Sequence, residues 1–176
     1  SFAYDGDYDV RDVSFTLKKN KTLGIIGGTG SGKSTIINLA EKFYTPALGS
    51  IEFCGRSVAD YDVAAMRRNV GYVPQRAAVL RGTLKSNLAI ADENATDERL
   101  EHALELAQAS ELLASLGLDG EIVGGGKNLS GGQRQRVSIA RALCRDNVLY
   151  LFDDATSALD YKTERSFINA MKNVSG

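Results

Sequence analysis

Short apolar stretches in this chain predict its strands. Residues 13–17 alternate apolar and polar side chains, which is typical of a half-buried strand, whereas residues 23–26 form a continuous apolar run. Residues 50–54 and 70–73 have the character of further short strands. Residues 148–152 are five consecutive apolar side chains, which predicts a central strand covered on both faces.

Helical periodicity dominates the middle of the chain. Apolar side chains recur at i, i+3, i+4 and i+7 after Thr96, a predicted N-cap, and a second helix is predicted after Ser130. The remaining helices are predicted over residues 34–44, 63–68 and 162–173. The predicted core positions of the helices are Leu100, Ala103, Leu104, Ala107, Val137, Ala140, Leu143, Cys144, Phe167, Ile168 and Met171. Strands toward both ends with helices between them predict an α/β fold with a helical insertion over residues 77–144.

Composition narrows the class of protein. The 176 residues correspond to one domain, with 43% hydrophobic and 24% charged side chains and a formal net charge of −1. This balance argues against disorder and gives no electrostatic basis for nucleic-acid binding. No apolar run is long enough to cross a bilayer, and the first residues lack the pattern of a signal peptide. Cys54, Cys144 and the single His102 are too dispersed for a zinc site; we expect both thiols in the core and His102 on a helix surface.

Residues 27–34 (GGTGSGKS) carry the most specific chemistry. They satisfy G-x-x-x-x-G-K-[ST] between a predicted strand and a predicted helix. The glycines allow backbone N–H groups to surround a polyphosphate at a helix N-terminus. Lys33 would neutralise β- and γ-phosphate charge, and the Ser34 hydroxyl would bind Mg²⁺. The alternative is a tight turn with a solvated lysine, and chance matches occur in on the order of one chain in a hundred.

Two later segments add to this signal. Asp153 follows a predicted buried strand, where α/β sheets bind ligands, and could hold Mg²⁺ through water; alternatively it caps the next turn. Residues 129–133 (LSGGQ) open a helix with Ser130 as the expected N-cap, which gives a second anion-binding terminus. Two such termini in one small domain suggest a ligand shared between two copies.

The order of these motifs resembles the nucleotide-binding domain of ATP-binding-cassette (ABC) transporters. LSGGQRQR close upstream of the Asp153 strand is the sharpest element, and residues 82–88 and 153–160 look like the exporter branch. The resemblance implies an α/β P-loop NTPase (RecA-like) core with a β-rich N-terminal part and an inserted α-helical subdomain. It further implies that residues 1–176 are one such domain, short of its usual C-terminal end. Residues 1–76 and 145–176 would form the ATP-binding core. Residues 77–144 would form the helical subdomain, which contains the LSGGQ segment (residues 129–133), called the signature.

The resemblance also assigns roles. Tyr4 matches an aromatic that stacks on adenine, although alone it would be an ordinary strand aromatic. Gln75 matches a residue that contacts Mg²⁺ and the attacking water and faces the membrane domains, so the implied Mg²⁺ ligands are Ser34, Gln75 and Asp153. Asp160 matches a residue at the interface of two such domains. The implied nucleotide-binding residues are Tyr4, Gly28, Thr29, Gly30, Ser31, Gly32, Lys33, Ser34 and Thr35, and those reaching the partner's ATP are Ser130, Gly131, Gly132 and Gln133.

ATP and Mg²⁺ are thus the expected ligands. The expected partners are a second nucleotide-binding domain and transmembrane domains at the cytoplasmic face of the cell membrane, with no nucleic acid. Head-to-tail closure around Mg-ATP would drive transport.

The chain departs from the family pattern at three places. Asp154 stands where the general base is usually Glu; its side chain is shorter by ~1.5 Å, and a misplacement of ~1 Å can cost on the order of a hundredfold in rate. Residues 124–126 are glycines where exporters commonly carry Glu, and the switch histidine would lie beyond Gly176.

The expected catalytic residues are Asp154, Gln75 and Lys33. Because the general base is shortened to Asp154, the chain is expected to resemble the degenerate-site half of a bacterial heterodimeric multidrug or lipid-type exporter. The alternatives are a regulatory domain that occludes ATP with little turnover and a soluble, non-transport ABC ATPase.

Overall fold

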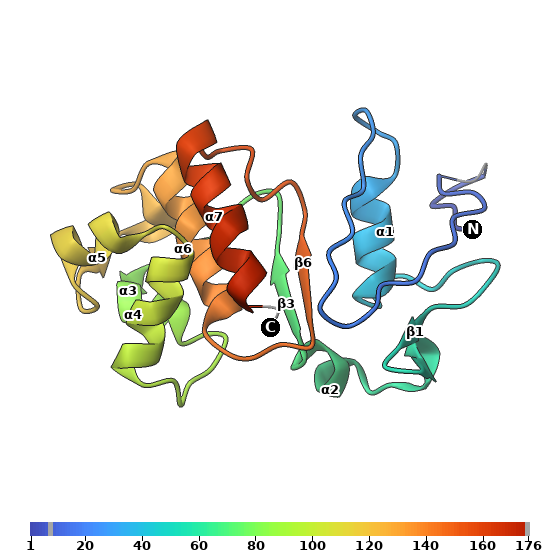
Figure 1. The fold of residues 1–176 in the computed structure, drawn as a ribbon, viewed down its shortest axis with the longest axis horizontal. Helices are drawn as coiled ribbons and strands as arrows, with labels where there is room; N and C mark the ends of the chain where they lie inside the picture. The colour runs from blue at the N-terminus through green and yellow to red at the C-terminus, as the bar shows by residue number, and fades with distance from the viewer. Residues whose placement is uncertain (7–8, 175–176) are drawn as a thin grey trace. The chain divides into compact units, whose positions relative to one another are not determined.

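The computed structural model describes residues 1–6 and 9–174, which divide into two compact units, Ser1–Val70 and Gly71–Gly176 (Figure 1). In the first unit the helices are α1 (Lys33–Ala40), the 3₁₀ turn η1 (Val58–Asp60) and α2 (Val63–Arg67), and the strands are β1 (Glu52–Phe53) and β2 (Arg56–Ser57).

Strands β1 and β2 form an antiparallel hairpin in which Glu52 lies opposite Ser57. Its two turn residues, Cys54 and Gly55, both have positive φ values of 51° and 76°, as a tight two-residue hairpin requires. Cys54 is exposed there, so the prediction that its thiol lies in the core is wrong. Apolar character alone does not determine burial, and the hairpin places residue 54 at its exposed tip.

The predicted strands over residues 13–17 and 23–26 are not strands in the structure. Neither segment has regular strand pairing, and their apolar side chains stay exposed: 47% for Val13, 53% for Phe15 and 97% for Ile26. Alternation selects the face of a strand only when a neighbouring strand pairs with its N–H and C=O groups. Local pattern alone therefore overstated the strand content here.

The second unit holds most of the helices. They are α3 (Leu84–Leu88), α4 (Asp97–Leu106), α5 (Ser110–Leu116), the 3₁₀ turn η2 (Gly124–Gly126), α6 (Gly131–Leu143) and α7 (Tyr161–Val174). Helix α6 packs against α3 and α4, and α4 also packs against α5 and α7, in the helical group of Figure 1. Two strand pairs accompany them: β4 (Gly82–Thr83) with β5 (Glu121–Ile122), antiparallel, and β3 (Val70–Val73) with β6 (Leu149–Phe152).

The core of this unit confirms the helical periodicity. The stripe of α4 is fully buried, since Leu100, Leu104 and Ala107 have no exposed surface, and Thr96 caps this helix by accepting a hydrogen bond from the Arg99 N–H. Val137, Ala140, Leu143 and Cys144 of α6 are buried as predicted. The prediction fails at Ile168, which is 49% exposed while Phe167 is buried.

Strand β6 is less covered than predicted. Its four residues are half-buried, and Val148 before it is 62% exposed. Within the described residues β6 pairs with β3, and the prediction of a strand covered on both faces is wrong. His102 lies on the exposed face of α4, as predicted.

Candidate functional site

The glycine-rich loop before α1 has the backbone that its sequence predicts. Gly30 and Gly32 take φ values of 77° and 86°, in the left-handed region, and Gly32 is the N-cap of α1. A Cβ on Gly32 would lie 2.9 Å from Val10 Cγ2 and 3.0 Å from the Asp9 carbonyl oxygen. Both conformation and space therefore require glycine at the start of this helix.

Lys33 is bound to the same loop. Its ammonium donates to the carbonyl oxygens of Gly27 at 2.7 Å and Gly28 at 2.8 Å, and the Ser31 N–H donates to the Gly28 carbonyl at 3.3 Å. The loop thus holds a positive charge beside a helix N-terminus, where the backbone dipoles also favour anions. The arrangement is built from local contacts and is suited to an anion at the helix N-terminus.

Tyr4 belongs to an aromatic cluster in the same unit. Its ring packs edge-on against Phe2 at 4.9 Å and Tyr44 at 5.1 Å between centroids, and its hydroxyl donates to the buried Thr35 Oγ1 at 3.3 Å. This hydrogen bond connects the ring to α1, two residues after Lys33. Tyr4 remains 46% exposed, so part of this residue is accessible to solvent.

In the second unit, three predicted site residues meet at the ends of β3 and β6. The Asp153 N–H donates to the Val73 carbonyl at 3.0 Å, which aligns the two strand ends, and the Asp153 side chain is buried. The Gln75 side-chain amide donates to Asp154 Oδ2 at 3.3 Å. Asp154 is exposed and takes a φ of 50°. The sequence predicts polar residues directly after the strand, and in the structure one of them, Asp154, accepts a hydrogen bond from Gln75.

The signature segment opens α6 through a capping box. The Gln133 N–H donates to Ser130 Oγ at 3.1 Å, and the Ser130 N–H donates to Gln133 Oε1 at 2.8 Å. Gln133 therefore stabilises the helix start. Gly131 is exposed, and a Cβ on Gly132 would lie 3.1 Å from the Ala158 carbonyl oxygen. The two glycines add no side chain to this helix terminus, which lies close to Ala158.

Comparison with known proteins decides the family. A model described as ABC transporter matches residues 10–157. The chain belongs to the ABC transporter family. It is 44% identical over 164 residues to an uncharacterised ABC transporter ATP-binding protein, YfiB, of Bacillus subtilis (strain 168), covering 92% of this chain and 29% of that protein. It is 42% identical over 176 residues to an ATP-dependent lipid A-core flippase of Vibrio parahaemolyticus, covering 97% of this chain and 30% of the flippase.

A solved structure agrees with the sequence relatives. The structure of a bacterial Atm1-family ABC exporter with ATP bound matches with a TM-score of 0.92 at 35% identity, over 99% of this chain and 31% of the exporter. The predicted α/β P-loop fold and the predicted resemblance to the nucleotide-binding domain of ABC transporters are thereby confirmed. The chain spans about three tenths of the length of these relatives.

Asp160 of this ABC domain serves as the N-cap of α7. Thr163 donates to it twice, from its N–H at 3.0 Å and from its hydroxyl at 2.7 Å. These donors, the backbone N–H first, hold the pKa of Asp160 below its usual value. Thr156 donates to Glu164 Oε1 at 2.6 Å, so both ends of residues 156–160 are attached to α7.

Two residues that sequence reasoning missed hold the loop that follows Gln75. Asn87, only 1% exposed in α3, accepts from the Leu80 N–H at 2.8 Å and donates to the carbonyls of Leu80 at 2.9 Å and Thr83 at 3.0 Å. Arg141 of α6 donates to the carbonyls of Asn87 at 2.8 Å and Ala78 at 2.9 Å. Burial lowers the pKa of Arg141. An asparagine between Leu84 and Leu88 on a buried helix face was the available signal.

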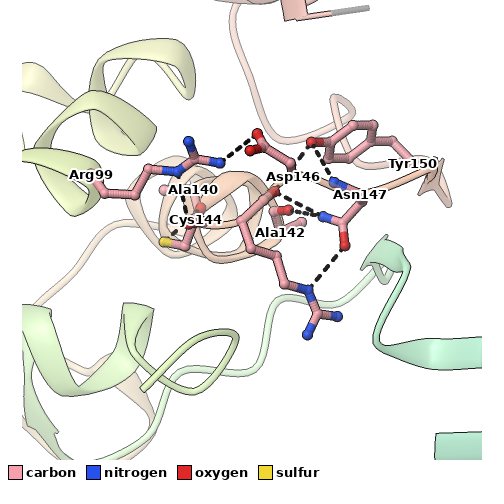
Figure 2. A network of polar contacts seen from close by, with 8 residues as sticks. Arg99, Ala140, Ala142, Cys144, Asp146, Asn147 and Tyr150 are labelled. Atoms are coloured by element: carbon pink, nitrogen blue, oxygen red, sulfur yellow. Dashed lines mark hydrogen bonds and ion pairs between the residues drawn. The ribbon is translucent and has the colours of Figure 1, made fainter. Parts of the chain in front are cut away.

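The turn from α6 to β6 is fixed by a second polar network (Figure 2). Arg99 of α4 donates to the Cys144 carbonyl at 3.0 Å and to Asp146 Oδ1 at 2.6 Å, and Asn147 donates to the Ala142 carbonyl at 2.8 Å. Gly71 of β3 fits against it, since a Cβ there would lie 2.8 Å from Asn147 Nδ2. The network satisfies carbonyls at the end of α6, and burial raises the pKa of the Cys144 thiol to about 12.

The three-glycine segment forms η2, in which Gly125 and Gly126 have φ values of 72° and 66°. A Cβ on Gly126 would lie 2.9 Å from Arg134 Cδ, and Arg134 donates to the carbonyls of Gly126 and Leu129. The three glycines that depart from the family pattern therefore form a turn that packs against Arg134 of α6.

Within residues 1–6 and 9–174, no group of three or more His, Cys, Asp or Glu side chains forms a cluster that could bind a metal ion. No helix among these residues is long and apolar enough to span a bilayer. Ser34 lies in the first unit, and Gln75 and Asp153 lie in the second.

Proposed function

We propose that this chain is the ATP-driven motor of an ABC exporter, attached to transmembrane domains at the cytoplasmic face of a cell membrane. The observation that carries the proposal is the match of 99% of the chain to an exporter solved with ATP bound. The glycine-rich loop of α1 and the glycine-opened start of α6 support it as two phosphate-facing helix termini.

The first terminus would bind the chain's own ATP. Tyr4 would stack on adenine, residues 28–35 would surround the phosphates, and Lys33 would exchange its carbonyl partners for phosphate oxygens. Its present partners are neutral carbonyls, so this exchange leaves no carboxylate unpaired. Binding energy then comes from charge-assisted hydrogen bonds to phosphate.

Mg²⁺ would be held by Ser34, Gln75 and Asp153. A hydroxyl, an amide oxygen and a carboxylate are the hard oxygen donors that Mg²⁺ prefers, and the donor set therefore fits the ion. When bound, the ion supplies positive charge that neutralises the developing charge on the β- and γ-phosphates. The buried position of Asp153 favours a defined ligand geometry, because its backbone is fixed by Val73.

The second terminus would bind ATP held by another nucleotide-binding domain. Ser130, Gly131 and Gly132 would reach its γ-phosphate, with Gln133 retained as the capping partner of Ser130. Asp160 would lie at the same interface. Two domains joined head to tail would each supply one phosphate loop and one signature, and closure on ATP would drive transport.

Asp154 would act as the general base, and its reach decides how well this site hydrolyses ATP. Its carboxylate accepts from Gln75 in the structure, a contact that occupies one oxygen. The short side chain of Asp154 favours a second candidate function, in which the chain occludes ATP with little turnover while a different partner chain carries the faster site. A heterodimer is therefore the favoured assembly.

The first experiment tests ATP binding with two lysine variants. Lys33→Ala should abolish the rise in thermal unfolding temperature that Mg-ATP produces, because ligand binding to the folded state is the source of that rise. Lys21→Ala, an exposed lysine of the same unit, should retain the full shift. An unchanged shift in Lys33→Ala would eliminate the proposed ATP site.

The second experiment tests the length of the base. Asp154→Glu in the full-length protein should raise ATP turnover by about tenfold or more, because the added methylene restores the reach of the carboxylate. Asp119→Glu makes the same change at an exposed position of the described chain and should leave turnover unchanged. No gain from Asp154→Glu would show that residue 154 does not limit hydrolysis.

A further inference from the structure

Both the side-chain carboxylate and the main-chain carbonyl of Asp154 accept hydrogen bonds in the structure. Its carboxylate accepts from Gln75 at 3.3 Å. Its carbonyl oxygen accepts twice from Ser157, from the N–H at 3.2 Å and from the side-chain hydroxyl at 2.9 Å. The two contacts fix the direction in which the side chain leaves the backbone.

The backbone at Asp154 needs such support. Its φ of 50° lies in the left-handed region, which costs a non-glycine residue energy and which Asp and Asn tolerate better than most. A conformation of this kind persists only where its surroundings impose it. Ser157 meets that requirement by bonding the carbonyl of the strained residue itself.

Ser157 is in turn part of an anchored segment. Thr156 on one side donates to Glu164 of α7, and Asp160 on the other caps α7. The Leu159 N–H closes the segment by donating to the Thr156 carbonyl at 2.9 Å. The hydroxyl of Ser157 therefore acts from a position fixed by a helix.

We propose that Ser157 is a positioning residue, which holds the Asp154 backbone in its left-handed turn so that the carboxylate points toward Gln75. The inference rests on the proposed role of Asp154 as the general base. The hydroxyl of Ser157 takes no part in proton transfer. Loss of it frees the carboxylate to rotate away, which lowers the hydrolysis rate and leaves ATP binding intact.

The test is a double-mutant cycle in the full-length protein, read by kcat and KM for ATP. Ser157→Ala should lower kcat about fivefold and leave KM within about twofold, as expected for one hydrogen bond that orients a reacting group. Ser157→Thr keeps the hydroxyl and should restore kcat. Because Ser157 is exposed, all three proteins should fold, and an unchanged Mg-ATP thermal shift checks this.

The second arm introduces Asp154→Ala. If Ser157 acts through residue 154, Ser157→Ala should have no further effect on single-turnover hydrolysis in the Asp154→Ala protein. A reduction by the same factor in both backgrounds, or wild-type kcat in Ser157→Ala, overturns the inference. Wild-type kcat in Asp154→Ala instead overturns the base role of Asp154 and the positioning with it, while the Lys33→Ala result still decides ATP binding.

Ser115 supplies a matched control. Its hydroxyl donates to the carbonyl three residues earlier, Leu112, at 3.1 Å, as Ser157 does to Asp154. Ser115→Ala removes the same kind of contact in α5 and should leave kcat unchanged. An equal loss of kcat in both variants would assign the effect of Ser157→Ala to general stability, against the proposal.

Discussion

The two units of this chain hold their functional groups by different means. In Ser1–Val70, the phosphate loop depends on backbone conformation, on Lys33 bonded to two carbonyls, and on a few aromatic contacts. In Gly71–Gly176, the signature helix and the Gln75 loop rest on a continuous apolar core and on buried polar networks. The proposed binding groups are therefore positioned by main-chain geometry in the first unit and by side-chain packing in the second.

Exposure of apolar side chains shows the same contrast. Leu84, Leu88 and Leu104 in the second unit have no exposed surface, whereas Ile26 in the first unit is 97% exposed. Burial of apolar surface is the main source of folding free energy. The second unit should thus carry most of the stability, and local substitutions in the first should act on ATP binding more than on unfolding.

The largest expected effect is the loss of a core side chain from the second unit. Leu104→Ala should reduce the free energy of unfolding by about 3–4 kcal/mol, because it removes buried methyl groups and leaves a cavity. Ile26→Ala in the first unit should change it by less than about 0.5 kcal/mol, as for exposed positions generally. Urea unfolding of both variants measures the difference, and equal losses would refute the contrast between the units.

Local sequence signals predicted the second unit better than the first. The α4 stripe and the caps Thr96 and Ser130 were found because a helix is decided within a few residues. Residues 13–17 and 23–26 were predicted as strands and are not, because strand formation depends on a pairing partner that the pattern does not identify. The glycine-rich motif was recognisable from Gly27, Gly28, Gly30 and Gly32, and Asp153 was recognisable from its position after an apolar run. Their neighbours Asn87 and Arg141 were not, since the carbonyls they bind are known only from the fold.

The next effect concerns the buried polar network of the second unit. Asn87→Ala should cost about 2–3 kcal/mol, because the Leu80 N–H and the Leu80 and Thr83 carbonyls lose their partner. Hydrogen exchange of the Leu80 amide should accelerate with it. Asn169→Ala on the exposed face of α7 is the control and should leave both readouts unchanged. Retained protection of Leu80 in Asn87→Ala would mean that side-chain packing does not hold this loop.

A smaller effect tests the first unit at its backbone. Gly32→Ala should cost about 2 kcal/mol, from a left-handed residue with a Cβ and from its contact with the Asp9 carbonyl. It should also weaken Mg-ATP binding, measured by the thermal shift. Gly24→Ala, where a Cβ would meet nothing within 4 Å, should be neutral in stability. If Gly32→Ala bound Mg-ATP like the wild type, main-chain geometry would not control this site.

The smallest effect compares two carboxyl groups whose pKa values shift in opposite directions. In the first unit, burial raises the pKa of Glu41 and outweighs the opposing effect of Arg67, and one buried carboxylate oxygen has no hydrogen-bond partner among the described residues. In the second unit, donors from Thr163 lower the pKa of the exposed Asp160. A raised pKa contributes stability at low pH that is lost as pH rises through the folded value. A lowered pKa contributes stability above the unfolded value that is lost as pH falls through the folded one.

The two variants Glu41→Gln and Asp160→Asn should therefore have opposite pH dependence in thermal unfolding. Relative to the wild type, Glu41→Gln should gain stability as pH rises from about 4 to 8, because the wild type loses the favourable protonated form. Asp160→Asn should be less stable than the wild type at pH 8, and the difference should shrink toward pH 3, since protonated Asp160 no longer accepts as an anion from Thr163. Parallel pH profiles would show that both carboxyls respond to the same environment, and the distinction between a buried group in one unit and a capping group in the other would not hold.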